Sequence, residues 1–326
     1  MPDLVLVTGA TGFIGSKLCS KLLAEGYKVR ALARKTSSLA ALKGLPVEIV
    51  VGDILEPESL TPALKGVTGV FHAAAESAYW RYPELVLRTS VEGTRNIVQG
   101  AVQAGVQFVV LTSSYAAMGV PASDELLTES HYFNLPQEAF LYGYSKFKAE
   151  VEALQIADGQ LRLVILNPSI VLGPGDFSRN SGSLVTEAAR GWGFFWLEGG
   201  INIIHIDDVV AAHLAAVRKG RSGERYLLGG ENLTYKFVFS TLNEVTGRKP
   251  PWLKIPPWTI RPIAKAIDWL SRLIPIPFSS GQLRMSRHYL YCDTTKARRE
   301  LGLPKPRPFR QAAQEAYDWY QEQGMI

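Results

Sequence analysis

Three glycines at a fixed spacing, Gly9, Gly12 and Gly15, lie in the segment VLVTGATGFIGSKL near the start of the chain. An apolar run typical of a buried strand precedes them, and a helical pattern follows. Such a turn brings backbone N–H groups close to a pyrophosphate at a helix N-terminus. The spacing is G-x-x-G-x-x-G instead of the commoner G-x-G-x-x-G, but a plain tight turn would not require three glycines in this register. The segment therefore predicts a dinucleotide site contacted by Gly9, Thr11, Gly12, Phe13, Ile14 and Gly15.

Short apolar runs alternate with longer helical patterns through the first half of the chain. The strand-like runs cover residues 4–8, 28–33, 47–51, 69–74, 107–112 and 161–166, and the helical patterns lie near 13–25, 57–65, 84–104 and 142–157. Apolar strands separated by helices are typical of a parallel sheet that is buried on both faces. Right-handed crossovers then predict an α/β fold with a doubly wound parallel sheet, the Rossmann fold, with its ligand at the carboxyl ends of the strands.

The pattern changes after residue 173, where glycine-, serine- and proline-bearing loops begin. An aromatic stretch, GWGFFWLEGG, follows at 191–200, and helices joined by proline-rich connectors occupy the last third of the chain. We expect a dinucleotide-binding domain of residues 1–175 plus about 201–230. The smaller C-terminal substrate lobe would comprise about 176–200 plus 231–326.

Composition narrows the class of protein. A net charge of +5 without a run of five like charges makes nucleic-acid binding a weak interpretation. Cys19 and Cys292 are far apart and in no metal-ligand spacing, so we interpret both as reduced structural residues and expect no metal. Neither a signal peptide nor a long apolar span is visible, which favours a cytoplasmic protein.

The end of the second strand bears on cofactor choice. Sites selective for NAD usually carry an acidic residue there, which binds the ribose 2′-hydroxyl. This chain has Arg34 and Lys35 instead, and two cations would attract a 2′-phosphate. We therefore expect NADP in preference to NAD. Asp53, followed by Ile54, could contact the adenine, although Asp53 could equally cap the next helix.

The segment LYGYSKFKAE contains two tyrosine–lysine pairs at helical spacing, Tyr142 with Lys146 and Tyr144 with Lys148. Tyr144 falls on an apolar stripe with Phe140, Phe147, Val151 and Leu154, which predicts a packing role. Tyr142 and Lys146 lie on roughly the opposite face, which we expect to point at the cofactor.

The first pair has a chemical purpose. A free phenol has a pKa of about 10, and a nearby ammonium group would lower it toward the range useful for acid–base catalysis. Tyr142 could then exchange a proton with a substrate oxygen while Lys146 holds a ribose hydroxyl of the cofactor. Ser114, at the end of the fifth strand, is our candidate to polarise that oxygen, with Ser113 as the alternative. Either serine could instead cap a helix or a turn. Thr112 ends the same strand beside the cofactor.

Six motifs occur in a consistent order: TGATGFIG, FHAAA, LTSS, YGYSK, NPSIVLGPG and IHIDD. Together they resemble the extended short-chain dehydrogenase/reductase family, in its NAD-dependent epimerase/dehydratase group. The chain is most similar to dihydroflavonol 4-reductase-like proteins and, through SVEGTRN, GERYLLGGENLT and EVTGR, to hopanoid-associated sugar epimerase-like proteins.

The resemblance implies roles for individual residues. It matches Tyr142 and Lys146, with Ser145 before the lysine, and selects Ser114 over Ser113. It implies that Asn167, Pro168 and Ser169 lie beside the nicotinamide carboxamide, and that Ala73, Ala74 and Ala75 pass the adenine ribose and pyrophosphate. It also implies a homodimer through the helices near 84–104 and 142–157.

Two departures from the family pattern concern function. Ser90 stands where many members have an asparagine, which puts that residue's helix-bending or proton-relay role in doubt. Residues suited to gripping a nucleoside diphosphate are replaced by aromatic ones, Trp192, Phe194, Phe195 and Trp196. If these face the site, they predict a flat or apolar substrate. Packing within the lobe would explain them equally well.

Three functions remain open at this stage. The leading one is an NADP-dependent oxidoreductase that interconverts a ketone and an alcohol on a small apolar or aromatic molecule. The second is an epimerase or dehydratase that retains its NAD, and the third is a non-enzymatic dinucleotide sensor.

The segment 256–278 combines Trp258 and Trp269 with Arg261, Lys265 and Arg272. That composition suits a membrane-surface helix, a lid or a lobe helix packed on the sheet domain.

Overall fold

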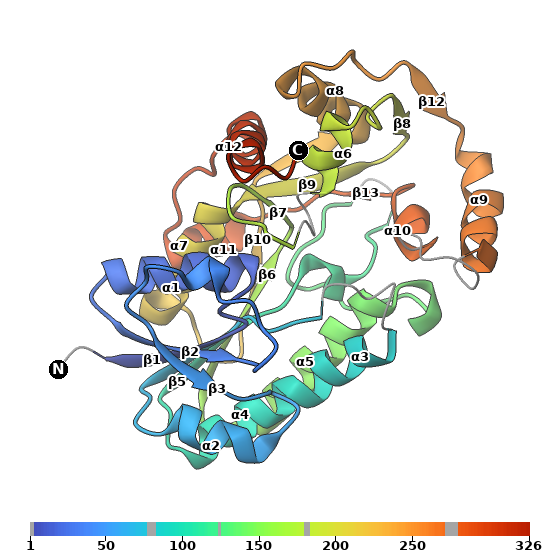
Figure 1. The fold of residues 1–326 in the computed structure, drawn as a ribbon. Helices are drawn as coiled ribbons and strands as arrows, with labels where there is room; N and C mark the ends of the chain where they lie inside the picture. Colours follow the sequence, from blue (N-terminus) through green and yellow to red (C-terminus); the bar gives the residue numbers. More distant parts are fainter. Residues whose placement is uncertain (1–2, 77–82, 123–124, 179–182, 271–279) are drawn as a thin grey trace.

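The computed structural model describes residues 3–76, 83–122, 125–178, 183–270 and 280–326 (Figure 1). Its central element is a seven-stranded sheet in the order β10-β6-β5-β4-β1-β2-β3, and each neighbouring pair is parallel. The strands are β1 (Leu4–Thr8), β2 (Lys28–Ala33), β3 (Glu48–Val51), β4 (Gly69–His72), β5 (Phe108–Thr112), β6 (Arg162–Pro168) and β10 (Arg225–Leu228). The predicted doubly wound parallel sheet is confirmed, with β10 as an additional strand at one edge.

Helices cover both faces of this sheet. They are α1 (Phe13–Ala24), α2 (Pro57–Leu64), α3 (Pro83–Leu87), α4 (Gly93–Gln103), α5 (Leu141–Ala157) and α7 (Ile206–Lys219). A π-helical turn, Arg88–Glu92, joins α3 to α4, and short 3₁₀ turns cover Ala40–Leu42, Tyr115–Met118 and Gln137–Ala139.

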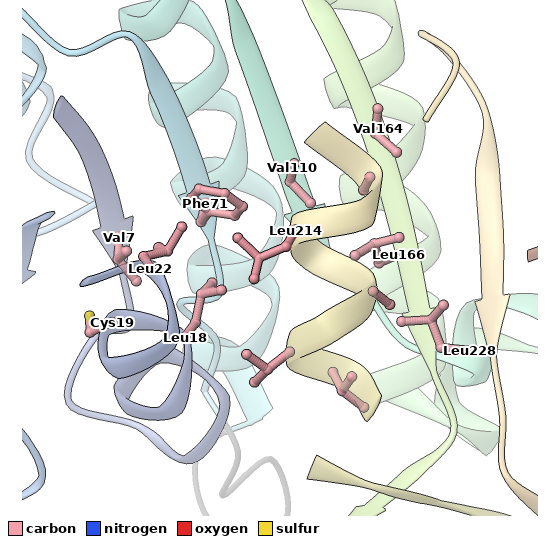
Figure 2. Packing of buried hydrophobic residues seen from close by; sticks show 14 of the residues in the cluster. Val7, Leu18, Cys19, Leu22, Phe71, Val110, Val164, Leu166, Leu214 and Leu228 are labelled. Carbon is pink, nitrogen blue, oxygen red and sulfur yellow. The ribbon is translucent and has the colours of Figure 1, made fainter. Parts of the chain in front are cut away.

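Alternate residues of the inner strands enter two different cores. In β5, Val110 belongs to the core under α1 and α7, whereas Val109 and Leu111 belong to the core under α2, α4 and α5. Figure 2 shows side chains of α1 and α7, among them Leu22 and Leu214, gathered around Phe71 of β4. Because both faces are buried, the strands are apolar almost without interruption.

A second set of elements forms above the carboxyl ends of the strands (Figure 1). A mixed sheet has the order β11-β9-β13 with β7 also paired to β9, and β8 pairs with β12 in a separate two-stranded sheet. These strands are β7 (Ile170–Leu172), β8 (Phe195–Leu197), β9 (Gly200–His205), β11 (Glu231–Thr234), β12 (Leu253–Ile255) and β13 (Tyr289–Leu290). The remaining helices are α6 (Ser183–Ala189), α8 (Tyr235–Val245), α9 (Pro257–Leu270), α10 (Ser280–Met285), α11 (Thr295–Leu301) and α12 (Phe309–Glu322).

The two parts share elements. Strand β9 pairs with β7 and β11 although it falls in the range predicted for the dinucleotide domain, and α11 contributes Ala297 and Leu301 to the core under α7. The domain boundaries given above stay predictions.

Both cysteines are buried and unpaired. Burial raises the pKa of the Cys19 thiol to about 12, so this thiol stays protonated in the core. Among the described helices, none combines the length and apolar character that crossing a bilayer requires. Helix α9 covers most of the segment singled out at 256–278, while Arg272 lies outside the described residues.

Candidate active site

The three positions of the first turn are occupied by glycine for different structural reasons. Gly9 has a φ of +64°, and a Cβ there would lie 2.7 Å from the backbone of Ala73 and Ala74. A Cβ on Gly15 would overlap the carbonyl oxygen of Gly9. Gly12 is exposed and has a negative φ, so the fold itself demands it least. A glycine that packing does not require suits close approach of a ligand.

The N-terminus of α1 is arranged to receive an anion. Gly12 is its N-cap and supplies no side-chain cap, and no acidic residue lies in the first turn. Phe13 and Ile14 pack on the core, while Thr11 is half-buried at the turn. Uncapped N–H groups at a helix N-terminus favour phosphate, so this turn fits the pyrophosphate of a dinucleotide.

A buried histidine fixes the neighbouring loop. The Thr8 hydroxyl accepts from the Ala74 N–H at 3.3 Å and lies 2.6 Å from His72 Nδ1, while His72 Nε2 lies 3.0 Å from the Thr94 hydroxyl. The network ties the ends of β1 and β4 to α4. It holds Ala73 and Ala74 against Gly9, with Ala75 exposed beyond them.

The cation pair lies at the carboxyl end of β2, as predicted. Arg34 and Lys35 are exposed, and neither forms an ion pair with another described residue. They are therefore available to an anionic ligand.

Asp53 and Ile54 are held by the protein itself. One Asp53 carboxylate oxygen accepts from the Leu55 N–H at 2.9 Å, which closes a turn two residues on and does not cap α2 directly. The Ile54 side chain packs into the core against Gly93, and its carbonyl accepts from Asn96 at 2.8 Å. Only part of the predicted adenine contact thus remains open to a ligand.

Tyr142, Ser114 and Lys146 come together at the start of α5. The hydroxyl groups of Tyr142 and Ser114 are hydrogen-bonded, and Lys146 Nζ donates to the Thr112 carbonyl at 3.3 Å. Ser114 and Lys146 are buried, whereas Tyr142 is half-buried. This places an acid–base pair at the carboxyl edge of the sheet, where ligands bind in such folds.

The electrostatics differ from the sequence prediction. Burial raises the pKa of Tyr142, and its hydrogen bond with Ser114 offsets the rise only in part. Burial also lowers the pKa of Lys146 to about 8, against the opposing effect of Glu150. The expected net lowering of the phenol pKa is therefore wrong, because desolvation dominates.

Neighbouring residues at the end of β5 point in different directions. Thr112 bonds His213 Nε2 at 2.8 Å through its hydroxyl, so only its carbonyl lies toward Lys146. The Ser113 hydroxyl donates to the Glu150 carboxylate. Ser114 is thus the serine that reaches Tyr142, which favours it over Ser113.

A buried ion pair behind the site was missed in the sequence. Arg225 Nε lies 3.0 Å from Glu150, and both side chains are buried. Asn167 donates to Glu150 at 2.5 Å and to the Ser114 carbonyl at 3.0 Å. Glu150 follows Lys146 by one helical turn, and that spacing was the available signal. Together with Asn167, the pair links α5, β6 and β10 behind Tyr142, Ser114 and Lys146.

The face of α5 that packs on the sheet is not its predicted apolar stripe. Its buried residues include Lys146, Ala149, Glu150 and Ala153, so small side chains bring this face close to the sheet. Tyr144 lies outside it, with its ring 5.8 Å from that of Phe133.

The sequence model of the NAD dependent epimerase/dehydratase family matches residues 5–229, which hold every site residue described above. The chain belongs to this family.

Two curated relatives and one solved structure extend the match over the whole chain. "Putative dihydroflavonol 4-reductase" of Synechocystis sp. is 36% identical over 100% of this chain and 97% of its own. "Sterol demethylase protein B" of Methylococcus capsulatus is 37% identical over 98% and 99%. The crystal structure of gox2253 is 36% identical and covers 99% of both chains with a TM-score of 0.88. The chain is thus an enzyme of the short-chain dehydrogenase/reductase type.

One departure from the family pattern lies in a π-helical turn. Ser90 lies within the π-helical turn between α3 and α4, and the Ser145 hydroxyl lies 3.3 Å from its own. Ser145 also donates to the Tyr142 carbonyl at 2.8 Å. Ser90 therefore lies in a π-helical turn and contacts α5.

The segment NPS lies at the end of β6 in this family member. Asn167 donates hydrogen bonds to Glu150 and to the Ser114 carbonyl, and Pro168 is the last residue of the strand. The Ser169 hydroxyl donates to Asn202 at 2.7 Å, so it is held by the second sheet. Asn167 Oδ1 is buried without a partner among the described residues, which leaves an acceptor beside Ser114.

The aromatic stretch makes its ring contacts within the lobe. Phe194 stacks on Trp252 at 6.1 Å, and Phe195 lies 6.1 Å from Phe239. Two lysines lie over the Trp196 ring, and Trp192 is exposed. These contacts favour the lobe-packing alternative over a role in the substrate site.

Proposed function

We propose that this enzyme is an NADP-dependent oxidoreductase that interconverts a ketone and an alcohol on a small apolar substrate. The observation that carries the proposal is the hydrogen-bonded Tyr142–Ser114 pair with Lys146 behind it, at the sheet edge that also bears the glycine turn. When bound, the nicotinamide supplies or accepts the hydride.

Ser114 and Tyr142 have different roles toward the substrate oxygen. Ser114 donates a hydrogen bond that polarises a carbonyl, and Tyr142 transfers its proton to the same oxygen. Because burial raises its pKa, Tyr142 is protonated at neutral pH and ready to act as an acid. The positive charge on Lys146 stabilises the phenolate that remains, and in the reverse direction Tyr142 accepts the proton.

The choice of NADP rests on charge. Arg34 and Lys35 are exposed at the end of β2, where acids select NAD in related sites. Planar guanidinium and ammonium donors suit a phosphate group. A 2′-phosphate would form ion pairs with both Arg34 and Lys35.

An apolar substrate is supported by what surrounds Tyr142. The Phe140 ring lies 6.2 Å from the Tyr142 ring, and Phe140 and Tyr115 pack on a cluster of buried residues. We call it the site cluster, and it comprises Met118, Val120, Leu127, Leu227, Met285, Leu290 and Cys292. The names of the two curated relatives refer to a dihydroflavonol and to sterol demethylation. A dihydroflavonol and a sterol are both ring compounds.

An epimerase or dehydratase with retained NAD is the second candidate, favoured by the description of the family itself. Net consumption of the cofactor distinguishes the two candidate functions. The proposed reductase oxidises one NADPH for each alcohol formed, whereas the alternative consumes no cofactor.

The test combines purified protein, NADPH or NADH, and two substrate panels of apolar ketones and nucleoside-diphosphate sugars. The proposal expects stoichiometric NADPH oxidation with a ketone and weaker binding of NADH. Isomerisation or dehydration of a sugar nucleotide without net cofactor consumption would contradict it.

A further inference from the structure

Four tryptophans of the second part of the molecule are exposed to solvent. The relative exposures are 60% for Trp192, 74% for Trp252, 77% for Trp258 and 63% for Trp269. Tryptophan is highly buried on average, so four exposed rings in one region require an explanation.

Two of these rings share one face of α9. At about 100° per residue, Trp258, Pro262, Lys265 and Trp269 fall on a single stripe, and all four are exposed. Ile260 and Ala264 lie on the opposite side and are buried. The helix is therefore amphipathic in an unusual sense, because its solvent face carries its largest apolar side chains together with a cation.

The neighbouring two-stranded sheet continues this surface. Strand β12 leads into α9 after a single residue, and Leu253 of β12 is exposed beside Trp252. Lys236 and Lys254 lie 5.3 Å and 5.2 Å from the centre of the Trp196 ring. Figure 1 shows β8, β12 and α9 following one another along one side of the molecule. We call the exposed residues of β12 and α9, together with Trp192 and Trp252, the tryptophan surface.

The positive charge around this surface indicates what kind of partner it binds. Residues 235–269 contain six Lys and Arg against two Asp and Glu, so this short segment holds four of the chain's five net positive charges. Indole rings prefer the level of lipid headgroups, where the ring is apolar and the N–H remains solvated. Lysines beside them attract anionic headgroups.

We propose that the tryptophan surface docks on an anionic lipid bilayer. Trp258 and Trp269 enter the headgroup region, Trp252 and Leu253 extend the contact, and Lys265 faces lipid phosphates, with Lys254 in an ion pair with Glu198 at 3.0 Å. This association does not depend on the identity of the substrate. It would also bring the bilayer near the site, because α9 packs on α10, whose Met285 belongs to the site cluster.

Vesicle co-sedimentation of the full chain tests the proposal. We use vesicles of phosphatidylglycerol and phosphatidylcholine in about equal parts, and vesicles of phosphatidylcholine alone. The chain should sediment with the anionic vesicles, and added salt should weaken its binding. A Trp258→Ser/Trp269→Ser variant should lose about tenfold or more in partitioning, and Lys254→Glu/Lys265→Glu should bind anionic vesicles no better than neutral ones.

The matched control removes exposed apolar surface elsewhere. Ile49 and Val51 are exposed on the edge strand β3, and Ile49→Ser/Val51→Ser should bind vesicles like the unmodified chain. Unchanged thermal unfolding and unchanged NADPH binding verify that each variant is folded. Failure of the unmodified chain to sediment with anionic vesicles at low salt would overturn the proposal, as would equal binding by the tryptophan variant. Self-association through the same tryptophans without vesicle binding would do so too.

Discussion

Ser113 and Ser114 are adjacent in the chain but belong to different structures. Ser113 donates to Glu150 in the interior, while Ser114 bonds the Tyr142 hydroxyl. The alternation of side chains along an extended strand produces this division.

Substitution of the two serines should therefore have different effects. Ser114→Ala removes the donor to the substrate oxygen and should lower kcat about 10²-fold without changing NADPH affinity. Ser113→Ala should leave kcat within a few-fold but lower the free energy of unfolding by about 1–3 kcal/mol, since it deprives a buried carboxylate of a donor. Steady-state kinetics and urea unfolding measure both. Equal losses of kcat in the two variants would contradict this assignment.

The proposed selection of NADPH by Arg34 and Lys35 can also be tested at the residue scale. Arg34→Ala/Lys35→Ala should raise the Kd of NADPH roughly 10- to 100-fold, because charge-assisted hydrogen bonds contribute about 1.5–3 kcal/mol. The Kd of NADH should barely change. Lys28→Ala is the control, since Lys28 is exposed at the opposite end of β2. Calorimetric titration checks the result, and an equal loss for both cofactors would refute the role of the pair.

Helix α5 illustrates which elements sequence can predict. Its ends were predicted within one residue, and six strands of the large sheet were recognised, because burial on both faces leaves uninterrupted apolar runs. The packing face was not recognised, since Ala149 and Ala153 carry little hydrophobic signal although they pack most closely. Partners such as Arg225 are remote in sequence, and β10 is only four residues long. Such pairings follow from the assembled sheet and leave no local pattern.

The pair that holds α5 to β10 can be tested by substitution. Arg225→Met leaves the buried Glu150 carboxylate without its cation and should destabilise the protein by about 3–5 kcal/mol. Glu150→Gln/Arg225→Met should recover part of that loss, because neither charge remains. Chemical denaturation measures both free energies. A double variant no more stable than Arg225→Met would contradict this account.

At the scale of the whole molecule, two buried histidines couple folding to pH. Burial lowers the pKa of His72 to about 3, helped by the charge of Lys146, and lowers that of His213 to about 4. Both groups are neutral in the folded protein and titrate near 6.5 once unfolded. Protons therefore bind preferentially to the unfolded chain, and stability is lost as pH falls below about 6.5.

The contribution of His213 to the pH dependence of stability can be measured by comparing the unmodified protein with His213→Gln. Between about pH 7.5 and pH 5, the unmodified protein should lose about 2 kcal/mol more free energy of unfolding than His213→Gln. Taking the difference cancels the carboxyl groups that titrate in the same range. Urea unfolding at the two pH values measures it, and parallel losses in the two proteins would show that His213 is not the coupled group.

The central claim is that Tyr142 is the acid of a reductase, and the neighbouring tyrosine supplies its control. The direct measurement is NADPH oxidation by Tyr142→Phe and Tyr144→Phe with an apolar ketone that the unmodified enzyme reduces. We predict that Tyr142→Phe loses about 10²- to 10⁴-fold in kcat with NADPH binding intact, whereas Tyr144→Phe stays within a few-fold. Retention of kcat in Tyr142→Phe, or an equal loss in both variants, would contradict the account.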